Sequence, residues 1–531
     1  MHMLRTLAVL SLAICFASSA SRCIAQDSSA SAAPAAGFQH RGFYLHGCWK
    51  YSYPFAVRSW QREDYNAVFH LLRRLGFDRV MLWPVLEAVP APLSNQDAQA
   101  VRSFRPIIED ARKAGLECWL TQCVVTSRPE IAAKPWMERS LYSFMKTVRL
   151  DDPEQARVYL QHRAALMTIL NNADGYVTID GDPGSYPGAK PSDFLKVFLA
   201  DRQTLDRAGE RLEKQKLIPW IWSGWGTKGV WVEPIEPYVQ ATLAELKRGM
   251  PEPWELLPGR SVEGHANKRV NIDLTAAAGL LERSTLLTYE AIEFEPSLPS
   301  AVLQFDLIRN MLRKELPHAA VTRGCFGNAQ QPLMVIPNLY FYARCAAEPS
   351  YLSRQDEQVL ADLADLFGGP PELLVPAWSC LRLGLDRLPA DLPKRLRTAT
   401  LTGEAAQFIP GGPARYLSIL AAQVESRIRV LSVNATVPAT TAEAAEGLAE
   451  GIAAMVDWWK LHRYVGGGTG DEPFQWSYAD ANHQAILTRW CQEHVKDVPA
   501  TAALAARRLV EQSVLPEPVA GPRVAELLQQ R

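Results

Sequence analysis

The sequence predicts an α/β protein, a (β/α)8 TIM barrel followed by an α-helical C-terminal domain. Eight strand-like apolar segments alternate with amphipathic helical segments, and after Ser353 the pattern turns to helices alone. Strict alternation is typical of a parallel sheet, and eight units within about 300 residues match a closed barrel better than an open sheet. No G-x-G-x-x-G follows the first strand, which argues against a dinucleotide-binding fold.

The predicted strands share short apolar runs that end near glycine, proline or polar residues. They lie at Gly42–His46, Arg79–Trp83, Glu117–Cys123, Gly175–Ile179, Leu217–Trp222, Trp254–Leu257, Thr285–Glu290 and Ala319–Cys325, the sixth being the weakest. Helical periodicity, with proline or aspartate at the start of several segments, predicts helices at 64–75, 97–114, 153–171, 191–214, 237–249, 274–283 and 299–315. The C-terminal helices are predicted at 355–366, 414–431, 441–461, 483–494, 498–512 and 524–530.

Length and composition set the domain organisation. The chain has 531 residues, of which 48% are hydrophobic and 21% charged, as in ordinary globular proteins. Arg5 and the apolar run Leu7–Ala17, followed by small residues, have the layout of a cleaved secretory signal. The expected parts are a signal peptide at 1–25, a disordered lead-in at 26–38, the barrel at 39–350 and the helical domain at 351–531. We therefore expect a secreted or periplasmic protein.

Charge and motif content exclude several function classes. The net charge is −1 and no Lys/Arg run occurs, so no nucleic-acid partner is expected. The apolar run is too short to span a bilayer, so no membrane association is expected after signal cleavage. His40 and His46 lack the spacing of a metal-ligand pair, and there is neither a H-E-x-x-H motif nor a G-x-S-x-G motif. No metal or cofactor is implied, and the oligomeric state stays open.

The cysteines predict mostly buried thiols. Seven cysteines lie beyond the predicted signal, an odd number, and they are scattered through hydrophobic segments. A bridge between Cys118 and Cys123, or between Cys325 and Cys345, is left open.

The segment from Asp174 to Gly188 carries the main functional signal. A short strand ends in Asp180-Gly-Asp182, followed by a loop rich in proline and glycine. Catalytic groups of (β/α)8 enzymes sit at the carboxyl ends of the strands, so Asp180 and Asp182 are candidate catalytic carboxylates. The structural alternative is that they only cap the next helix or order a turn.

A second set of carboxylates follows other strands. Glycoside hydrolysis needs one carboxyl group to protonate the leaving oxygen and another to activate water or attack the sugar. Glu290 ends the seventh strand, and the alternation Leu286, Thr288, Glu290 predicts that it points into the barrel. Glu293 lies in the next loop, and Glu87 follows the second strand. Glu290 and Glu293 are therefore candidate catalytic groups, and Glu87 is a candidate substrate-binding residue.

Aromatic residues gather at the same predicted strand ends. Aromatic faces stack on the C–H faces of sugar rings, although any single Trp is more often part of a core. The candidate stacking residues are Trp49, Trp83, Tyr186, Trp222 and Trp225. Arg323, Asn328 and Gln330, at the last strand, are candidates for binding sugar hydroxyls or a carboxylate, which the guanidinium fork of arginine suits.

The segment Asp174-Gly-Tyr-Val-Thr-Ile-Asp180-Gly-Asp182-Pro-Gly184 resembles the fourth-strand segment of family-67 α-glucuronidases and related barrel glycosidases. A second stretch, Arg323–Gln331 with Pro337–Arg344, is similar to the segment that joins the barrel to the C-terminal helices in that group, which includes uncharacterised relatives. The resemblance implies a general acid at Asp182. Barrel hexosaminidases of the same group use an Asp-Glu pair at this strand, whereas this chain has Asp-Gly-Asp.

The leading hypothesis is an exported glycoside hydrolase acting on a poly- or oligosaccharide. Asp182 or Asp180 would be the general acid, and Glu290 or Glu293 the base or nucleophile. Two rivals remain open. One is a non-catalytic carbohydrate-binding barrel that lacks one carboxylate, and the other is a lyase or a different hydrolase on the same barrel, because fold does not fix function.

Overall fold

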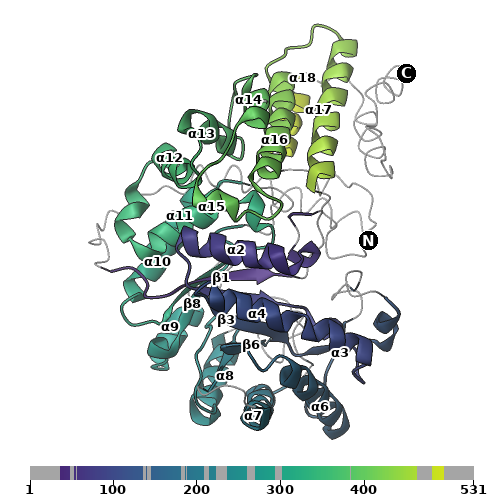
Figure 1. Cartoon of the computed structure of the whole chain (residues 1–531), viewed down its shortest axis with the longest axis vertical. Coiled ribbons are helices and arrows are strands. Elements are labelled where there is room, and N and C mark those ends of the chain that lie inside the picture. Colours follow the sequence, from purple (N-terminus) through teal and green to yellow (C-terminus); the bar gives the residue numbers. More distant parts are fainter. Residues whose placement is uncertain are drawn as a thin grey trace. The chain divides into compact units, whose positions relative to one another are not determined.

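A computed structural model describes thirteen stretches of the chain. They are residues 36–47, 53–55, 57–134, 139, 145–180, 186, 188–208, 214–222, 236–259, 270–293, 302–382, 384–462 and 481–494. All of them belong to one compact unit that begins at Ala36 (Figure 1). The predicted signal at 1–25, most of the lead-in and the helices predicted at 498–512 and 524–530 lie outside these stretches.

Seven parallel strands form the main sheet. They are β1 (Arg41–His46), β2 (Arg79–Trp83), β3 (Glu117–Cys123), β6 (Gly175–Ile179), β7 (Lys216–Trp220), β8 (Thr285–Thr288) and β9 (Gly324–Ala329). Their order in the sheet is β7-β6-β3-β2-β1-β9-β8, and every neighbouring pair is parallel. A small antiparallel hairpin, β4 (Val125–Ser127) with β5 (Met145–Thr147), follows β3.

The segment Trp254–Leu257 closes the sheet into a barrel. It bridges β7 on one side and Ser284, at the start of β8, on the other, always in parallel. The Leu257 N–H donates to the Pro219 carbonyl at 3.0 Å, and the Thr285 N–H donates to the Leu256 carbonyl at 2.9 Å. This segment is the predicted sixth strand, so the hydrogen-bonded ring is complete and the predicted (β/α)8 barrel is confirmed.

Helices follow the strands around the barrel (Figure 1). They are α2 (Arg62–Leu75), α3 (Asn95–Arg102), α4 (Phe104–Lys113), α6 (Pro153–Ile169), α7 (Pro191–Ala208), α8 (Glu236–Gly249), α9 (Val270–Ala277), α10 (Phe305–Glu315) and α11 (Ile336–Ala347). The helix predicted at 97–114 is two helices that meet at Ser103. Helix α2 ends at Gly76, whose left-handed φ of 105° suits a glycine.

The last strand lies later in the sequence than predicted. Strand β9 covers Gly324–Ala329, whereas Leu316–His318 form a 3-10 turn that continues from α10. The backbones of Gly324 and His40 come very close at the start of this strand. A Cβ atom on Gly324 would lie 2.4 Å from the His40 carbonyl oxygen, so only glycine fits there. A strand rich in small residues shows little alternation of apolar and polar side chains. The strand was therefore predicted in the segment just before it.

Alternation along the strands separates an inner from an outer layer. On β1, Tyr44 belongs to the inner cluster, while Phe43 and Leu45 belong to the outer one. Tyr44 meets Trp220 of β7, a strand that is not its neighbour, with ring centroids 5.4 Å apart. The inner layer consists of Tyr44, Met81, Trp83, Val85, Ala88, Trp119, Cys123, Val125, Ile131, Val177, Ile179, Ile218, Trp220, Leu257, Leu287, Tyr289 and Phe326. Side chains therefore pack the barrel interior, as is usual for this fold.

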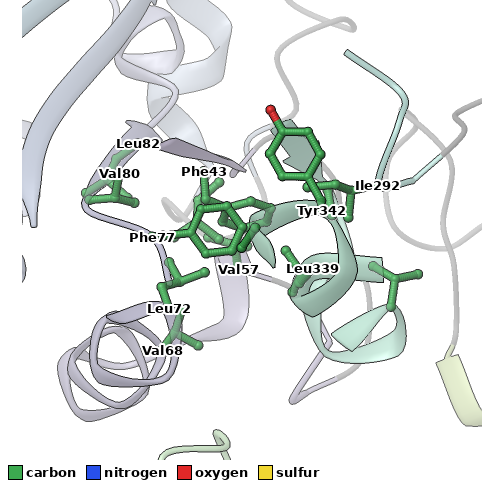
Figure 2. Close-up of a cluster of buried hydrophobic side chains, with 14 of the residues drawn as sticks. Phe43, Val57, Val68, Leu72, Phe77, Val80, Leu82, Ile292, Leu339 and Tyr342 are labelled. Atoms are coloured by element: carbon green, nitrogen blue, oxygen red, sulfur yellow. The ribbon is translucent and has the colours of Figure 1, made fainter. Parts of the chain in front are cut away.

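The outer layer packs the strands against the helices. Figure 2 shows Phe43 between the α2 side chains, such as Leu72, and the α11 side chains Leu339 and Tyr342. All of these residues are at most 1% exposed. Burying side chains of this size contributes on the order of 1.5–3 kcal/mol each, so the helices are held to the barrel mainly by apolar contacts.

Further helices follow the barrel after the turn Pro349–Ser353. They are α12 (Asp356–Phe367), α13 (Pro371–Ser379), α14 (Leu392–Thr398), α15 (Glu404–Gln407), α16 (Pro413–Asn434), α17 (Thr441–His462) and α18 (Ala481–His494). Trp378 and Leu420 share one continuous buried cluster with Phe43 of the barrel. Residues of α16, α17 and α18, including Trp490, form a separate cluster. The boundary predicted at 350 stays a prediction.

An ion network fills the amino end of the barrel. Arg79 at the start of β2 pairs with Glu117 of β3 at 2.9 Å and with Glu255 at 3.4 Å. Lys216 of β7 bridges the same two carboxylates at 2.8 Å and 2.6 Å. The Arg79 guanidinium also lies 5.2 Å from the centroid of the Trp119 ring. Two cations and two anions therefore neutralise each other beneath the inner layer.

Two further sequence expectations concern cysteines and membranes. Cys118, Cys123, Cys325 and Cys345 are buried free thiols, so neither bridge left open by the sequence forms. None of the described helices is both long and apolar enough to cross a membrane.

Candidate active site

The carboxyl edge of the barrel collects most of the residues singled out in the sequence. Because all strands run parallel, their carboxyl ends meet at one edge. Of the predicted site residues, this edge brings together Trp83, Glu87, Asp180, Trp222, Glu290, Glu293, Asn328 and Gln330. Trp49, Asp182 and Trp225 lie outside the described stretches.

Asp180 links β6 to β7 and to α8. Its carboxylate accepts the backbone N–H of Trp222 at 2.7 Å and the hydroxyl of Tyr238 at 2.8 Å. Tyr238 belongs to α8, outside the barrel. The carboxylate is buried, with Asp180 1% exposed. Asp180 therefore joins neighbouring elements at the end of its strand, which differs from the acid role that the sequence suggested for it.

Glu293 links the segment after β8 to the end of β9. Its carboxylate accepts the backbone N–H groups of Gln330 and Gln331, the latter at 2.9 Å. Two backbone donors hold one oxygen atom in place, and the residue is 3% exposed. The structure thus gives Glu293 a part in fixing the β8 and β9 ends, in addition to the catalytic role predicted for it.

Glu87 links β2 to β3 in the same manner. Its carboxylate accepts the Trp83 indole N–H at 3.0 Å and the backbone N–H of Cys123. Burial raises the pKa of the Glu87 carboxyl above its ordinary value, although the hydrogen bonds and the distant Arg163 oppose this shift. Among the carboxyl groups of this edge, Glu87 thus keeps a proton to higher pH than an exposed glutamate does.

Glu290 has an unusual backbone. Its φ is 67°, in the left-handed region, and its N–H donates to the Asn328 side-chain oxygen at 2.8 Å. Leu287 and Tyr289 face the barrel interior, whereas the Thr288 hydroxyl donates to Glu315 on the outer side at 2.5 Å. The alternation predicted for Glu290 was therefore wrong, because the left-handed turn, and not the strand, sets its direction.

The carboxyl edge also holds the other strained backbone of the described chain. Val85, just after β2, has a φ of 58°, and Val85 and Glu290 are the two non-glycine residues with positive φ in the described stretches. A branched residue in this region is a genuine outlier. Backbone strain gathers at functional sites more often than elsewhere, so both outliers favour a functional role for this edge.

Aromatic rings surround these carboxylates. Trp222 meets Tyr289 edge-on at 4.4 Å and Trp220 at 5.3 Å. Trp83 meets His46 edge-on at 4.7 Å. Trp222 is the half-buried member of this set, while the other four are at most 3% exposed. Trp222 is therefore the partly exposed ring of this set, and Trp83 belongs to the core.

Tyr186 is a packing residue. Its hydroxyl donates to Asp193, in the first turn of α7, at 2.7 Å. The guanidinium of Arg149 lies over its ring at 5.1 Å, and the residue is 2% exposed. Because Arg149 covers the ring, the predicted role of Tyr186 as a stacking platform is not supported.

Arg323 lies at the wrong end of the barrel for the role predicted from sequence. It precedes β9, whose first residue, Gly324, pairs with Thr285, the first residue of β8. Its side chain is exposed and donates to the Glu282 carbonyl at 2.8 Å. Arg323 therefore lies at the amino end of the barrel, away from the edge that holds the other candidates, and its substrate-binding role stays an untested prediction.

Two residues of the edge were missed in the sequence. His46 ends β1 and is 3% exposed, and burial lowers the pKa of its ring to about 3 against an opposing backbone hydrogen bond. It is therefore neutral at physiological pH. Gln331 is 1% exposed, and neither polar atom of its side chain has a hydrogen-bond partner among the described residues. For His46, the available signal was its place two residues after Tyr44 on the same strand. For Gln331, it was the place directly after the candidate Gln330.

Within the described stretches, no three His, Cys, Asp or Glu side chains come together in a way that would hold a metal ion. The arrangement at the carboxyl edge can supply carboxyl groups, neutral hydrogen-bonding groups and one half-buried indole.

No protein-family model matches the sequence, and no functionally curated protein matches it either. Similar solved structures include a GH138 enzyme targeting pectin rhamnogalacturonan II, with a TM-score of 0.49 and 10% identity over 90% of this chain and 69% of that one. A mutant O-GlcNAc hydrolase of Thermobaculum terrenum has a TM-score of 0.45 and 10% identity over 91% of this chain and 99% of that one. CpGH84B has a TM-score of 0.42 and 9% identity, over 93% and 77% respectively. The closed ring of strands establishes the barrel independently of these likenesses.

Proposed function

We propose that this protein is an exported glycoside hydrolase that acts on an oligo- or polysaccharide. Asp182 would protonate the leaving oxygen, and Glu290 would activate water or attack the sugar. Asp180 and Glu293 would hold the strand ends on which these two groups depend. Export is proposed from the N-terminal sequence, Arg5 with the apolar run Leu7–Ala17.

The burial and the backbone conformation of Glu290 support this proposal most strongly. Glu290 lies just after the end of β8, is 2% exposed, and has its backbone in the left-handed region. Tyr289, the preceding residue, touches the half-buried ring of Trp222. Sugar hydrolysis needs carboxyl groups at the reacting bond, and Glu290 is a buried acid at the carboxyl edge, next in sequence to a residue that contacts a half-buried indole.

The roles of the other carboxylates follow from their partners. Asp180 and Glu293 accept hydrogen bonds from fixed donors of neighbouring elements. These bonds hold both carboxyl groups at the strand ends, so a positioning role is assigned to the two residues. Asp182, two residues beyond Asp180, is the remaining acidic residue of that strand end, so the general acid role is assigned to it.

Activity on sugars tests the proposal directly. Purified protein is screened with aryl glycosides and with plant and algal oligosaccharides, alongside the Asp182→Asn and Glu290→Gln variants. General acid or base catalysis contributes roughly 10²–10⁴-fold, so each variant should lose activity by that factor while remaining folded.

Asp174→Asn is the matched control. Asp174 flanks the same strand as Asp180 but at the amino end, where it accepts the Cys118 N–H at 2.8 Å. This variant should lose some stability and keep its turnover number. Unchanged turnover in both Asp182→Asn and Glu290→Gln would contradict the proposal.

A non-catalytic carbohydrate-binding barrel is the second candidate. This candidate is favoured by the hydrogen bonds with which three carboxyl groups join neighbouring strand ends, those of Glu87, Asp180 and Glu293. A carboxyl group held in this way is less suited to act as a catalytic acid or base. Saturable binding of an oligosaccharide, without turnover of any substrate in the panel, would support this candidate over the enzyme.

A further inference from the structure

We propose that Asn328 is a positioning residue for Glu290. Its side-chain oxygen holds the Glu290 backbone in the left-handed conformation and thereby sets the direction of the Glu290 carboxyl group. This inference rests on the proposed function, because it assigns a purpose to the placement of Glu290 in sugar hydrolysis.

The hydrogen bond fixes how the Asn328 amide is oriented. Asn328 is 0% exposed and lies in β9, in register with the inward-facing Tyr44. Only its oxygen can accept the Glu290 N–H at 2.8 Å. The Asn328 Nδ2 group therefore points elsewhere, and it has no hydrogen-bond partner among the described residues.

That unpaired Nδ2 group argues against a purely structural asparagine. Buried polar groups of a fold are almost always hydrogen-bonded. Asn338, also 0% exposed, shows the usual pattern, because its Nδ2 donates to the Ile292 and Val302 carbonyls at 2.9 Å and 2.7 Å, and its oxygen accepts the Gln304 N–H at 3.0 Å. In Asn328, by contrast, the side-chain oxygen has a partner, the Glu290 N–H, and the Nδ2 group has none among the described residues.

The whole turn from Glu290 to Glu293 rests on β9. The Ile292 side chain lies over Gly327, where a Cβ atom would be 2.4 Å from Ile292 Cδ1. Glu293 accepts the N–H groups at the end of the same strand. A left-handed glutamate persists only where its surroundings enforce that conformation. Asn328 supplies a hydrogen bond to the backbone N–H of Glu290 itself.

The test compares Asn328→Ala and Asn328→Asp with Asn338→Ala in the full-length protein. Asn328→Ala should lower kcat at least tenfold while KM changes by less than about threefold, because it alters the reacting group and not the sugar contacts. Residue-resolved hydrogen exchange at the Glu290 amide should accelerate at least tenfold, because the bond is lost.

Asn328→Asp keeps an acceptor for the Glu290 N–H and adds a negative charge beside it. A like charge raises the pKa of a carboxyl group, so the acidic limb of the kcat/KM profile should move to higher pH. Asn338→Ala should reduce thermal stability and leave that limb in place. Should the Asp variant fail to fold, kcat and amide exchange in Asn328→Ala decide.

The outcomes separate this inference from the proposed function. Unchanged exchange at the Glu290 amide in Asn328→Ala would overturn the positioning role whatever the protein does. An active wild type whose kcat survives Asn328→Ala would overturn it as well. Wild type that turns over no glycoside would refute the proposed function, and the exchange result would still show whether Asn328 holds the turn.

Discussion

The carboxyl groups at the two ends of the barrel have different kinds of partner. At the amino end, Glu117 and Glu255 are paired with Arg79 and Lys216. At the carboxyl edge, Glu87, Asp180 and Glu293 accept hydrogen bonds from backbone N–H groups, an indole and a phenol. Two cations pair with the first set, whereas the second set is held by hydrogen bonds from neutral donors. The amino end is therefore built for stability, and the carboxyl edge is built for holding acids in position.

The largest expected effect on stability comes from breaking the amino-end network. Arg79→Met would remove the 2.9 Å pair with Glu117 and the 3.4 Å pair with Glu255. Removing one partner of a buried ion network costs about 4 kcal/mol. Urea unfolding monitored by fluorescence should show this loss, while turnover measured at a permissive temperature should stay near wild type. A strong loss of turnover without loss of stability would break the comparison.

The pH dependence of stability sharpens the comparison. Burial alone would raise the pKa of Glu117, but Arg79 and Lys216 lower it to about 2, from an ordinary value of 4.5. A carboxyl group whose pKa is depressed in the folded state stabilises the protein fully above pH 4.5 and loses that contribution as the pH falls toward 2.

A shift of this size is worth roughly 3 kcal/mol at most. The free energy of unfolding of wild type should therefore fall over that interval, and Glu117→Gln should fall less. Equal slopes for the two proteins would show that Glu117 does not carry this dependence.

The smallest effect is expected at Arg323. Its side chain is exposed at the amino end, so Arg323→Ala should leave KM and turnover unchanged and shift the free energy of unfolding by no more than about 0.5 kcal/mol. Asn328→Ala serves as the contrasting variant, since both residues were predicted from sequence to bind the sugar. A large rise in KM for Arg323→Ala would place the substrate at the opposite end from the one proposed.

The strands with strong patterns were predictable from sequence. Arg79–Trp83, Glu117–Cys123 and Gly175–Ile179 have the bounds that the apolar alternation predicts. The weak segment at Trp254–Leu257 was also placed correctly, because strict alternation requires a strand there. Periodicity served well wherever side chains of two layers alternate.

The errors arose where tertiary contacts override local pattern. A strand predicted at Ala319–Cys325 puts Arg323 near its carboxyl end, whereas the actual strand begins at Gly324 and puts Arg323 at its amino end. A shift of a few residues thus moved one side chain to the other pole of the barrel. Glu290 was predicted to face inward by alternation, but Asn328, 38 residues away, holds its backbone in a turn. No local signal announces such a contact.

The links formed by Asp180 and Glu293 were equally invisible in the sequence. The sequence alone does not distinguish an aspartate at a strand end that donates a proton to a substrate from one that accepts the N–H groups of the next strand. Only the positions of Trp222, Tyr238, Gln330 and Gln331 in space separate the two roles.

The most direct test of the difference between the two ends measures turnover and the free energy of unfolding together in Glu290→Gln and Glu117→Gln. Glu290→Gln should lose turnover by roughly 10²-fold or more and keep its stability, because the glutamine retains the backbone turn and its bond to Asn328. Glu117→Gln should lose stability at neutral pH and keep its turnover. If Glu290→Gln turned over substrate like wild type, or if Glu117→Gln were the inactive variant, the assignment of chemistry to the carboxyl edge would be contradicted.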